Sequence, residues 1–118
     1  MNKEIVRLNP KEIALLKENF ESLKFQNDFD IVYEAQVPTA GLILLEGEIN
    51  LLKKKKVCGS VLPMTLVGMQ QLMTNIPMKV GMRILSNSEL LVLHKSEIMK
   101  ALEDKKSKIY GIIKKAVG

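Results

Sequence analysis

The chain has 118 residues, of which 47% are hydrophobic and 26% are charged. This length predicts a single domain, residues 1–118, that can bury a core without disulfides or metals. The one cysteine, Cys58, excludes an internal disulfide, and no apolar run approaches the roughly eighteen residues needed to span a membrane. We therefore expect a cytoplasmic protein without a membrane segment.

The net charge of +5 is concentrated in two stretches, residues 53–56 and residues 105–115. Neither stretch is interleaved with aromatic side chains, which single-stranded nucleic acid needs for base stacking. A solvated hairpin tip and a solvated helix face are the preferred interpretation, so nucleic acid is a disfavoured partner. The alternative, nucleic-acid binding through these lysines, would show an affinity that falls steeply with salt.

A helix is predicted over residues 9–22. Asn9 is a typical N-cap, Pro10 suits the first helical position, and the carboxylate of Glu12 can reach back to the N-cap backbone. Ile13, Leu16 and Phe20 recur at three and four residues, so they should form one apolar stripe that packs on the rest of the domain.

From residue 25 to residue 94 the pattern is one of short apolar segments separated by Gly, Pro, Asn and Ser. Such segments, about ten residues apart, are typical of strands in a β-sandwich or barrel. Gly47 interrupts an apolar run and predicts a bend, and residues 53–56 form a charged hairpin tip. Strands are expected at residues 29–33, 42–45, 49–52, 57–61, 80–85 and 89–93.

Two segments depart from this strand pattern. Residues 67–81 predict a short helix followed by a loop that contains Pro77. Residues 96–117 predict closing helices that begin with Ser96 as the N-cap and are divided by the polar residues 103–108. Ile109, Ile112 and Ile113 lie on or near one face of the last helix.

This succession of elements resembles the cyclic nucleotide-binding domain, as in catabolite activator proteins and the regulatory subunits of cyclic-nucleotide-dependent kinases. Residues 44–49, Leu-Leu-Glu-Gly-Glu-Ile, resemble its strand-Gly-strand signature. Residues 60–68 are similar to its Gly-Pro-Gly-Asp-Phe-Phe-Gly run, and residues 88–93 resemble its last strand. The resemblance implies a mainly β fold, a β-roll (double-stranded β-helix or jelly roll) with an N-terminal helix, a short inserted helix and C-terminal helices.

The resemblance makes residues 67–81 the phosphate-binding cassette, which in the family reads Phe-Gly-Glu-Leu-Ala-Leu and then Pro-Arg-Ala-Ala-Thr. Gly68 and Pro77 match this form, but Met69 replaces the glutamate that binds the ribose and Met78 replaces the arginine that binds the cyclic phosphate. The resemblance therefore implies a degenerate ligand site. Its candidate residues are Gly68, Met69, Gln70, Pro77, Met78 and Lys79.

Methionines crowd the same part of the sequence. They either plug a former pocket or form an adaptable surface for a protein partner. They are Met64, Met69, Met73, Met78 and Met82.

No enzyme is predicted, because no nucleophile, acid–base pair or metal cluster can be assembled. His94 is the only histidine, which excludes a cupin-like metal site, and Cys58 is expected to be a buried or half-buried strand residue. We expect no metal and no cofactor. The predicted function is a non-catalytic signalling module that binds a protein partner or dimerises through Ile109, Ile112 and Ile113.

The alternative is a sensor of a cyclic mononucleotide or dinucleotide. It would hold the phosphate by altered contacts through Gly68 and Lys79.

Overall fold

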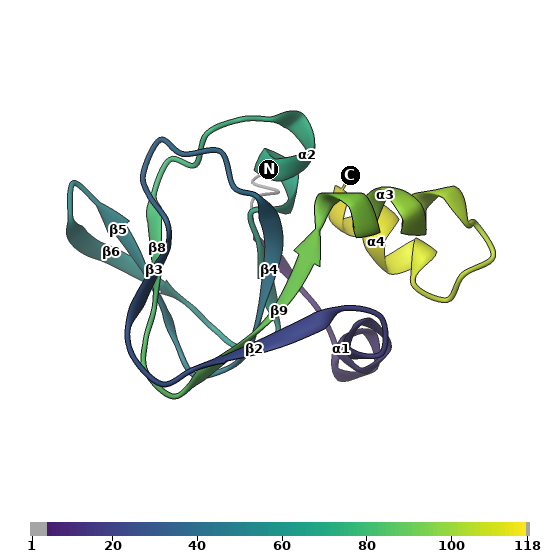
Figure 1. The fold of residues 1–118 in the computed structure, drawn as a ribbon, viewed down its shortest axis with the longest axis horizontal. Coiled ribbons are helices and arrows are strands. Elements are labelled where there is room, and N and C mark those ends of the chain that lie inside the picture. The colour runs from purple at the N-terminus through teal and green to yellow at the C-terminus, as the bar shows by residue number, and fades with distance from the viewer. Residues whose placement is uncertain (1–4, 118) are drawn as a thin grey trace.

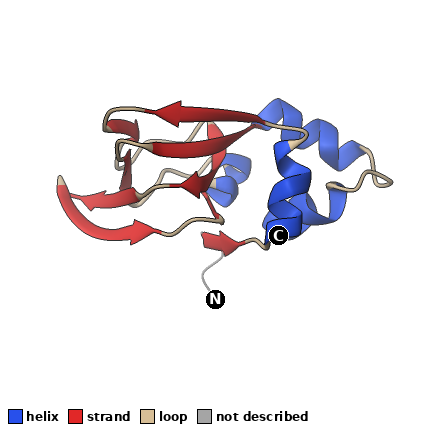
Figure 2. Ribbon diagram, turned by 90° about the horizontal axis from the view of Figure 1, so that it is seen from below, coloured by secondary structure: helices blue, strands red, loops and turns tan. Residues whose placement is uncertain are grey.

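The computed structural model describes residues 5–117, so both ends of the predicted 1–118 domain lie outside it. Two antiparallel sheets face each other, one of five strands in the order β1-β7-β4-β9-β2 and one of four in the order β3-β8-β5-β6 (Figures 1 and 2). The strands are β1 Ile5–Arg7, β2 Glu21–Phe25, β3 Phe29–Val32, β4 Ala40–Glu46, β5 Ile49–Lys53, β6 Lys56–Val61, β7 Thr65–Val67, β8 Gly81–Ile84 and β9 Ser88–His94.

Four helices lie on the side of the five-stranded sheet that faces away from the other sheet (Figure 1). They are α1 Pro10–Lys17, α2 Met69–Thr74, α3 Lys95–Glu103 and α4 Tyr110–Val117. None of the helices within residues 5–117 has the length and apolar character needed to cross a membrane.

The five-stranded sheet separates two cores. The roll core, between the sheets, holds Val32, Ala40, Leu42, Leu44, Ile49, Val61, Val67, Met78, Met82, Ile84, Leu90 and Val92. The helix-side core, under the helices, holds Leu8, Ile13, Leu16, Phe20, Ile43, Leu66, Met69, Leu72, Leu91, Leu93, Ile98, Ala101, Ile109, Ile112, Ile113 and Ala116. Because β4 and β9 contribute alternate side chains to each core, both read as continuous apolar runs in the sequence.

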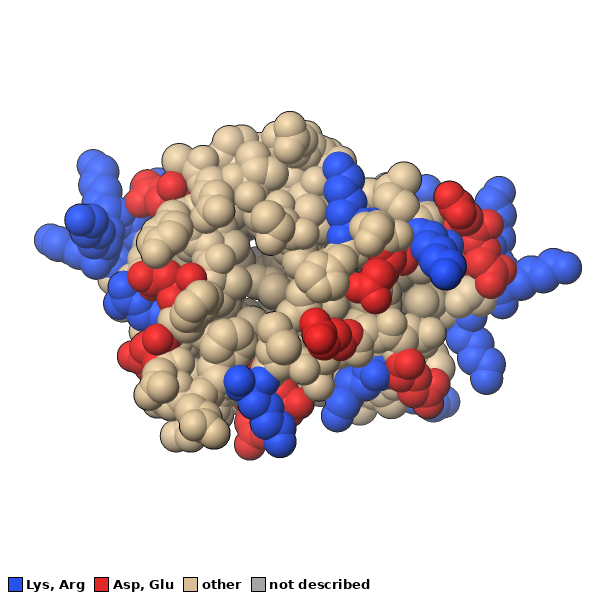
Figure 3. All heavy atoms as spheres, in the orientation of Figure 1, with Lys and Arg blue, Asp and Glu red and all other residues tan. Residues whose placement is uncertain are grey.

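The elongated molecule has basic side chains at both ends of its long axis. It measures 43 × 28 × 24 Å, and Figure 3 shows Lys and Arg gathered beyond the β5–β6 hairpin at one end and around α3 and α4 at the other. The hairpin tip at residues 53–56 is confirmed, since Lys53 pairs with Lys56 as the last rung. The division of the C-terminal helices at residues 103–108 is confirmed as well.

Several predicted boundaries are wrong. Helix α1 ends at Lys17 and not at residue 22, and β2 begins at Glu21 after a short turn. Strands β1 and β2 were not predicted, because β1 has three residues and β2 is an edge strand whose side chains are mostly exposed, which leaves no alternating pattern. Helix α3 starts at Lys95 with His94 as its N-cap, so Ser96 is not the cap, and Cys58 is exposed.

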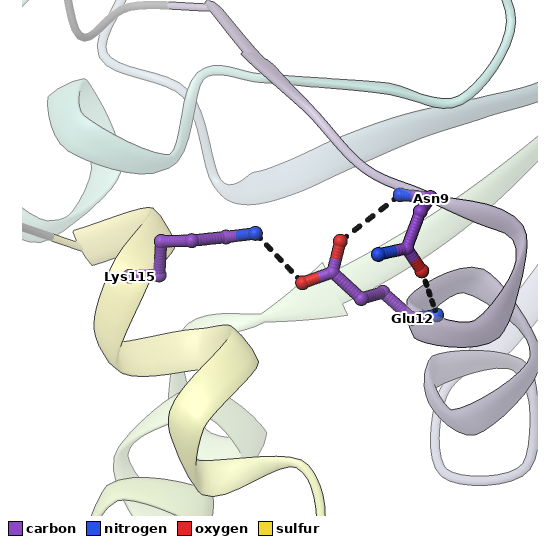
Figure 4. Close-up of polar contacts among 3 residues, drawn as sticks. All are labelled: Asn9, Glu12 and Lys115. Atoms are coloured by element: carbon purple, nitrogen blue, oxygen red, sulfur yellow. Dashed lines mark hydrogen bonds and ion pairs between the residues drawn. The ribbon is translucent and has the colours of Figure 1, made fainter.

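The predicted start of α1 is confirmed, and its cap also fastens the C-terminal helix. The N–H of Glu12 donates to Asn9 Oδ1 at 2.8 Å, and the N–H of Asn9 donates to Glu12 Oε1 at 2.9 Å. The second carboxylate oxygen of Glu12 accepts a hydrogen bond from Lys115 Nζ at 2.7 Å (Figure 4). One carboxylate thus caps α1 and links it to α4.

This arrangement sets the pKa of Glu12. Burial raises that pKa, but the hydrogen bond from Lys115, the backbone hydrogen bond from Asn9 and the charge of Lys115 outweigh burial, so the pKa is lowered from 4.5. A carboxyl group with a lowered native pKa stabilises the fold above its unfolded pKa and loses that contribution as the pH falls through the native value.

We predict that Glu12→Gln lowers the free energy of unfolding at pH 7 by about 0.5–1 kcal/mol, because Lys115 is half exposed and its charge is screened. The difference from the wild type should shrink as the pH falls below 4.5, the ordinary pKa of this carboxyl. Urea unfolding at several pH values measures it. In a Lys115→Met background, Glu12→Gln should lower the free energy of unfolding by clearly less than in the wild type. Equal losses in both backgrounds would contradict a stabilising interaction between Glu12 and Lys115.

The chain changes sheets at Gly47, which lies against Ser88. Gly47 has φ +94°, and a Cβ there would lie 2.7 Å from the Cα of Ser88. Ser88 Oγ accepts a hydrogen bond from the N–H of Glu48 at 3.0 Å. The bend predicted from this glycine is confirmed, and it holds the β4–β5 crossing against the start of β9.

We predict that Gly47→Ala costs about 3 kcal/mol or more of unfolding free energy, because it combines an unfavourable backbone conformation with a collision against main-chain atoms. Gly111→Ala is the matched control. No atom lies within 4 Å of a Cβ at this exposed position in α4, so it should stabilise by about 0.5–1 kcal/mol. Equal unfolding midpoints for the two variants would refute the close contact.

Candidate phosphate-binding cassette

The predicted cassette is a strand, a short helix and a loop. Gly68, with φ +79°, ends β7 and caps α2, and its carbonyl accepts the N–H of Leu72 at 2.9 Å. No side chain caps the first turn of α2. Asn75, with φ +58°, ends the helix in the left-handed conformation and directs residues 76–80 back towards β8. The fold of this stretch is therefore the one predicted.

Met78 lies inside the roll. Its N–H donates to the carbonyl of Gln36 at 2.9 Å, and its carbonyl accepts the N–H of Ala35 at 2.9 Å. These two bonds fix the backbone, and the side chain, 7% exposed, packs in the roll core together with the fully buried Met82. The position that resembles the phosphate-binding arginine is thus occupied by an apolar side chain. Lys79 is exposed, although strand alternation is not the reason, because residues 76–80 form a loop before β8.

Met69 lies in the other core. Its side chain is 2% exposed and belongs to the helix-side core. Its Cε lies 3.2 Å from the place where a Cβ on Gly41 would be, so the methionine packs directly on β4. Met64 and Met73 also pack against the helix-side core, whereas Met82 lies in the roll core. The five methionines therefore fill two separate cores and do not form one plug or one surface.

The remaining candidate residues have no shared polar site. Gln70 is half-buried, and its carbonyl accepts the hydroxyl of Thr74 at 2.7 Å. Pro77 is exposed. Gln71 was not among the predicted residues, yet it is only 5% exposed and its Oε1 has no hydrogen-bond partner among the described residues. A buried glutamine on a short helix leaves no signal in the sequence that could have indicated it.

Four surface hollows lie away from these candidate residues. Their volumes are about 250–420 Å³, and none of the four is lined by Gly68, Met69, Gln70, Pro77, Met78 or Lys79. In Figure 3 the surface between the two sheets is hollowed and bordered by uncharged side chains. Among the described residues no three His, Cys, Asp or Glu side chains are grouped to hold a metal ion.

The isoleucines predicted as a protein interface are buried. Ile109, Ile112 and Ile113 are 7%, 8% and 1% exposed, and all three belong to the helix-side core. Helix α4 packs back on α2 and α3, which the sequence does not reveal, so its apolar face is already covered. This placement corrects the prediction of a free surface there. The exposed side of α4 carries Lys114 and Lys115 instead.

Comparisons with known proteins identify the fold. No protein-family model and no curated protein matches the chain. A structure from work on a cyclic-GMP-dependent signalling pathway in bacterial phytopathogenesis matches at 14% identity, with a TM-score of 0.78 over 95% of this chain and 93% of that one.

Two other solved structures have the same architecture. A cyclic nucleotide-binding domain from Methylobacillus flagellatus KT matches at 16% identity and a TM-score of 0.73, over 93% of this chain and 64% of that one. The catabolite activator protein of Thermus thermophilus matches at 18% identity and a TM-score of 0.65, over 81% of this chain. The match spans 47% of the Thermus protein, about half its length.

These likenesses confirm the predicted fold, a mainly β roll with flanking helices. The chain has the fold of a cyclic nucleotide-binding domain. At such low identity the likeness establishes the architecture alone, and the side chains of the cassette have to be judged by their own chemistry.

We predict that Met78→Arg lowers the free energy of unfolding by about 2–4 kcal/mol, because it places a charge in the apolar roll core without a partner. Met78→Leu, a swap of similar volume, should cost less than about 1.5 kcal/mol. Chemical denaturation of both variants measures the difference. Equal free energies of unfolding for Met78→Arg and Met78→Leu would show that the roll can open at this position.

Proposed function

We propose that this chain is a non-catalytic regulatory domain of signalling that no longer recruits a nucleotide through its cassette and acts by contact with another protein. The observation that carries the proposal is the position of Met78. Its side chain fills the roll core at the place where the resembled family uses an arginine.

Without an arginine at position 78, a cyclic phosphate would lose charge-assisted hydrogen bonds. Each charge-assisted hydrogen bond to an anion contributes on the order of 1.5–3 kcal/mol, and a guanidinium makes two in parallel. Each 1.4 kcal/mol corresponds to about a tenfold change in affinity. A phosphate placed beside Met78 and Met82 would also lose its hydration without compensation. The proposal assigns no reaction, metal or cofactor to the domain, and it places the domain in the cytoplasm.

One observation favours the alternative, a sensor of a cyclic mononucleotide or dinucleotide. The first-turn N–H groups of α2 have no side-chain acceptor, and backbone donors of this kind suit an anion. Lys79 is exposed and takes part in neither of the two ion pairs found among residues 5–117. Such a sensor would use the backbone at Gly68 together with this lysine.

We predict that cyclic AMP, cyclic GMP, cyclic di-GMP and cyclic di-AMP, each titrated to millimolar concentration, leave the melting temperature unchanged. A ligand at one hundred times its dissociation constant adds about 2.7 kcal/mol to stability, which corresponds to a rise of many degrees in a domain of this size. A saturable rise that Lys79→Ala abolishes and Met78→Leu preserves would establish the sensor in place of the proposed function.

A further inference from the structure

A hollow of about 420 Å³ lies on the outer face of the four-stranded sheet, and of residues 67–81 only Gly81 lines it. Its floor is β8, where Gly81 and Arg83 alternate with the buried Met82 and Ile84, and its walls come from the β5–β6 hairpin and the turn at residues 33–36. We call it the hairpin hollow. The residues that decide its chemistry are Asp30, Tyr33, Glu34, Leu52, Lys54 and Lys55.

The two lysines on its rim have an unfavourable backbone conformation. Lys54 and Lys55 have φ +50° and +67°, the left-handed region that a two-residue hairpin loop usually fills with Asn-Gly. Neither lysine takes part in an ion pair among the described residues, so no such contact within the molecule offsets the cost. The two-residue turn requires this conformation, so the loop presents two lysines at positions where Asn-Gly would be less strained.

The walls of the hollow are held in place by hydrogen bonds. The N–H of Lys54 donates to Glu34 Oε1 at 2.8 Å, and the N–H of Tyr33 donates to Gln36 Oε1 at 2.9 Å. The same turn is bonded to Met78 through Ala35 and Gln36. The hairpin and the turn are thus fixed relative to each other, which lowers the entropic cost of binding.

The rim offers unpaired positive charge beside exposed apolar surface. Asp30 already pairs with Arg83, Oδ1 to Nε at 2.7 Å, and one oxygen of Glu34 is taken by the hairpin backbone. Within residues 5–117 the ammonium groups of Lys54 and Lys55 take part in no ion pair, and basic side chains gather beyond the β5–β6 hairpin in Figure 3. Tyr33, 64% exposed, lies beside them on the rim and gives the hollow an apolar wall.

We propose that the hairpin hollow docks a short acidic segment of a partner protein, with acidic side chains at Lys54 and Lys55 and an apolar side chain against Tyr33 and Leu52. Charge complementarity argues for this occupant. Tyr33 is the one aromatic residue in the lining, whereas a single-stranded nucleic acid is held by stacking of successive bases, so a peptide is the favoured occupant. The inference rests on the proposed function, because it names the surface through which such a domain would meet its partner.

The test distinguishes the effect of the two lysine charges on binding from an effect of the substitutions on folding. Lys54→Asn/Lys55→Gly removes both charges and supplies the residues that the left-handed turn prefers, so it should fold at least as well as the wild type. Lys105→Asn/Lys106→Gly removes the same charge from the opposite end of the molecule and serves as the matched control. Tyr33→Ala removes the ring and keeps the backbone hydrogen bonds of the turn.

The probe is the peptide Glu-Asp-Glu-Phe-Glu-Asp-Glu, followed by amide chemical shifts of the whole chain at physiological salt. We expect saturable shifts at the amides of Tyr33, Lys54 and Gly81. Lys54→Asn/Lys55→Gly should weaken binding about threefold to tenfold and Tyr33→Ala about tenfold, while the control leaves it unchanged. A peptide with Gln and Asn in place of the acids should not bind.

Three results would overturn the proposal. They are no shifts at these amides with millimolar peptide, an equal loss in the control variant, or tighter binding of a single-stranded oligonucleotide at the same amides. The nucleotide titration judges the proposed function separately. If neither the peptide nor any nucleotide binds, only the docking role of the hairpin hollow is refuted. If a nucleotide raises the melting temperature saturably, the proposed function is refuted.

Discussion

The contact between Gly47 and Ser88 is the constraint on which the roll depends. The chain leaves the five-stranded sheet at Gly47 and returns to it at Ser88, so two of the crossings between sheets meet at one point. The space there is filled by the side chain and the Cα of Ser88, and only glycine fits both this space and the backbone conformation. Because β5 and β8 lie beside these crossings, their positions, and with them the hairpin hollow and the end of the cassette, follow from this contact.

The side chains of residues 67–81 are divided between the two cores. In this fold the five-stranded sheet separates the interior of the roll from the helices, and the cassette contributes to both sides. Met69 completes the helix-side core, whereas Met78 completes the roll core. Each methionine fills apolar space on its own side of the sheet. A charged side chain at either position would be buried in an apolar core, which costs folding free energy.

The sequence allowed most elements to be predicted because its strongest signals are local, whereas their arrangement as a β-roll was implied by the resemblance to the cyclic nucleotide-binding domain. The Asn9–Glu12 capping box, the bend at Gly47 and the apolar runs of β4 and β9 each follow from residue type and spacing. The predictions that were wrong concern features that depend on contacts between residues distant in the sequence. Strand β2 has no pattern of its own and is defined by pairing with β9. The isoleucines of α4 resemble a free apolar face in the sequence, because nothing local shows that α4 packs on α2. The hairpin hollow likewise exists only when β3, β5 and β8 are brought together.

The pairing of the strands has a consequence for synthesis on the ribosome. Strand β1 pairs with β7, β2 with β9 and β3 with β8. The carboxylate of Glu12, which caps α1, is bonded to Lys115 in the last helix. The β5–β6 hairpin is the only strand pair among the described residues whose partners are adjacent in the sequence. Strands β1, β2 and β3 therefore have no partner until more than half of the sequence has been made. The β5–β6 hairpin can form first, and β8 and then β3 extend its sheet.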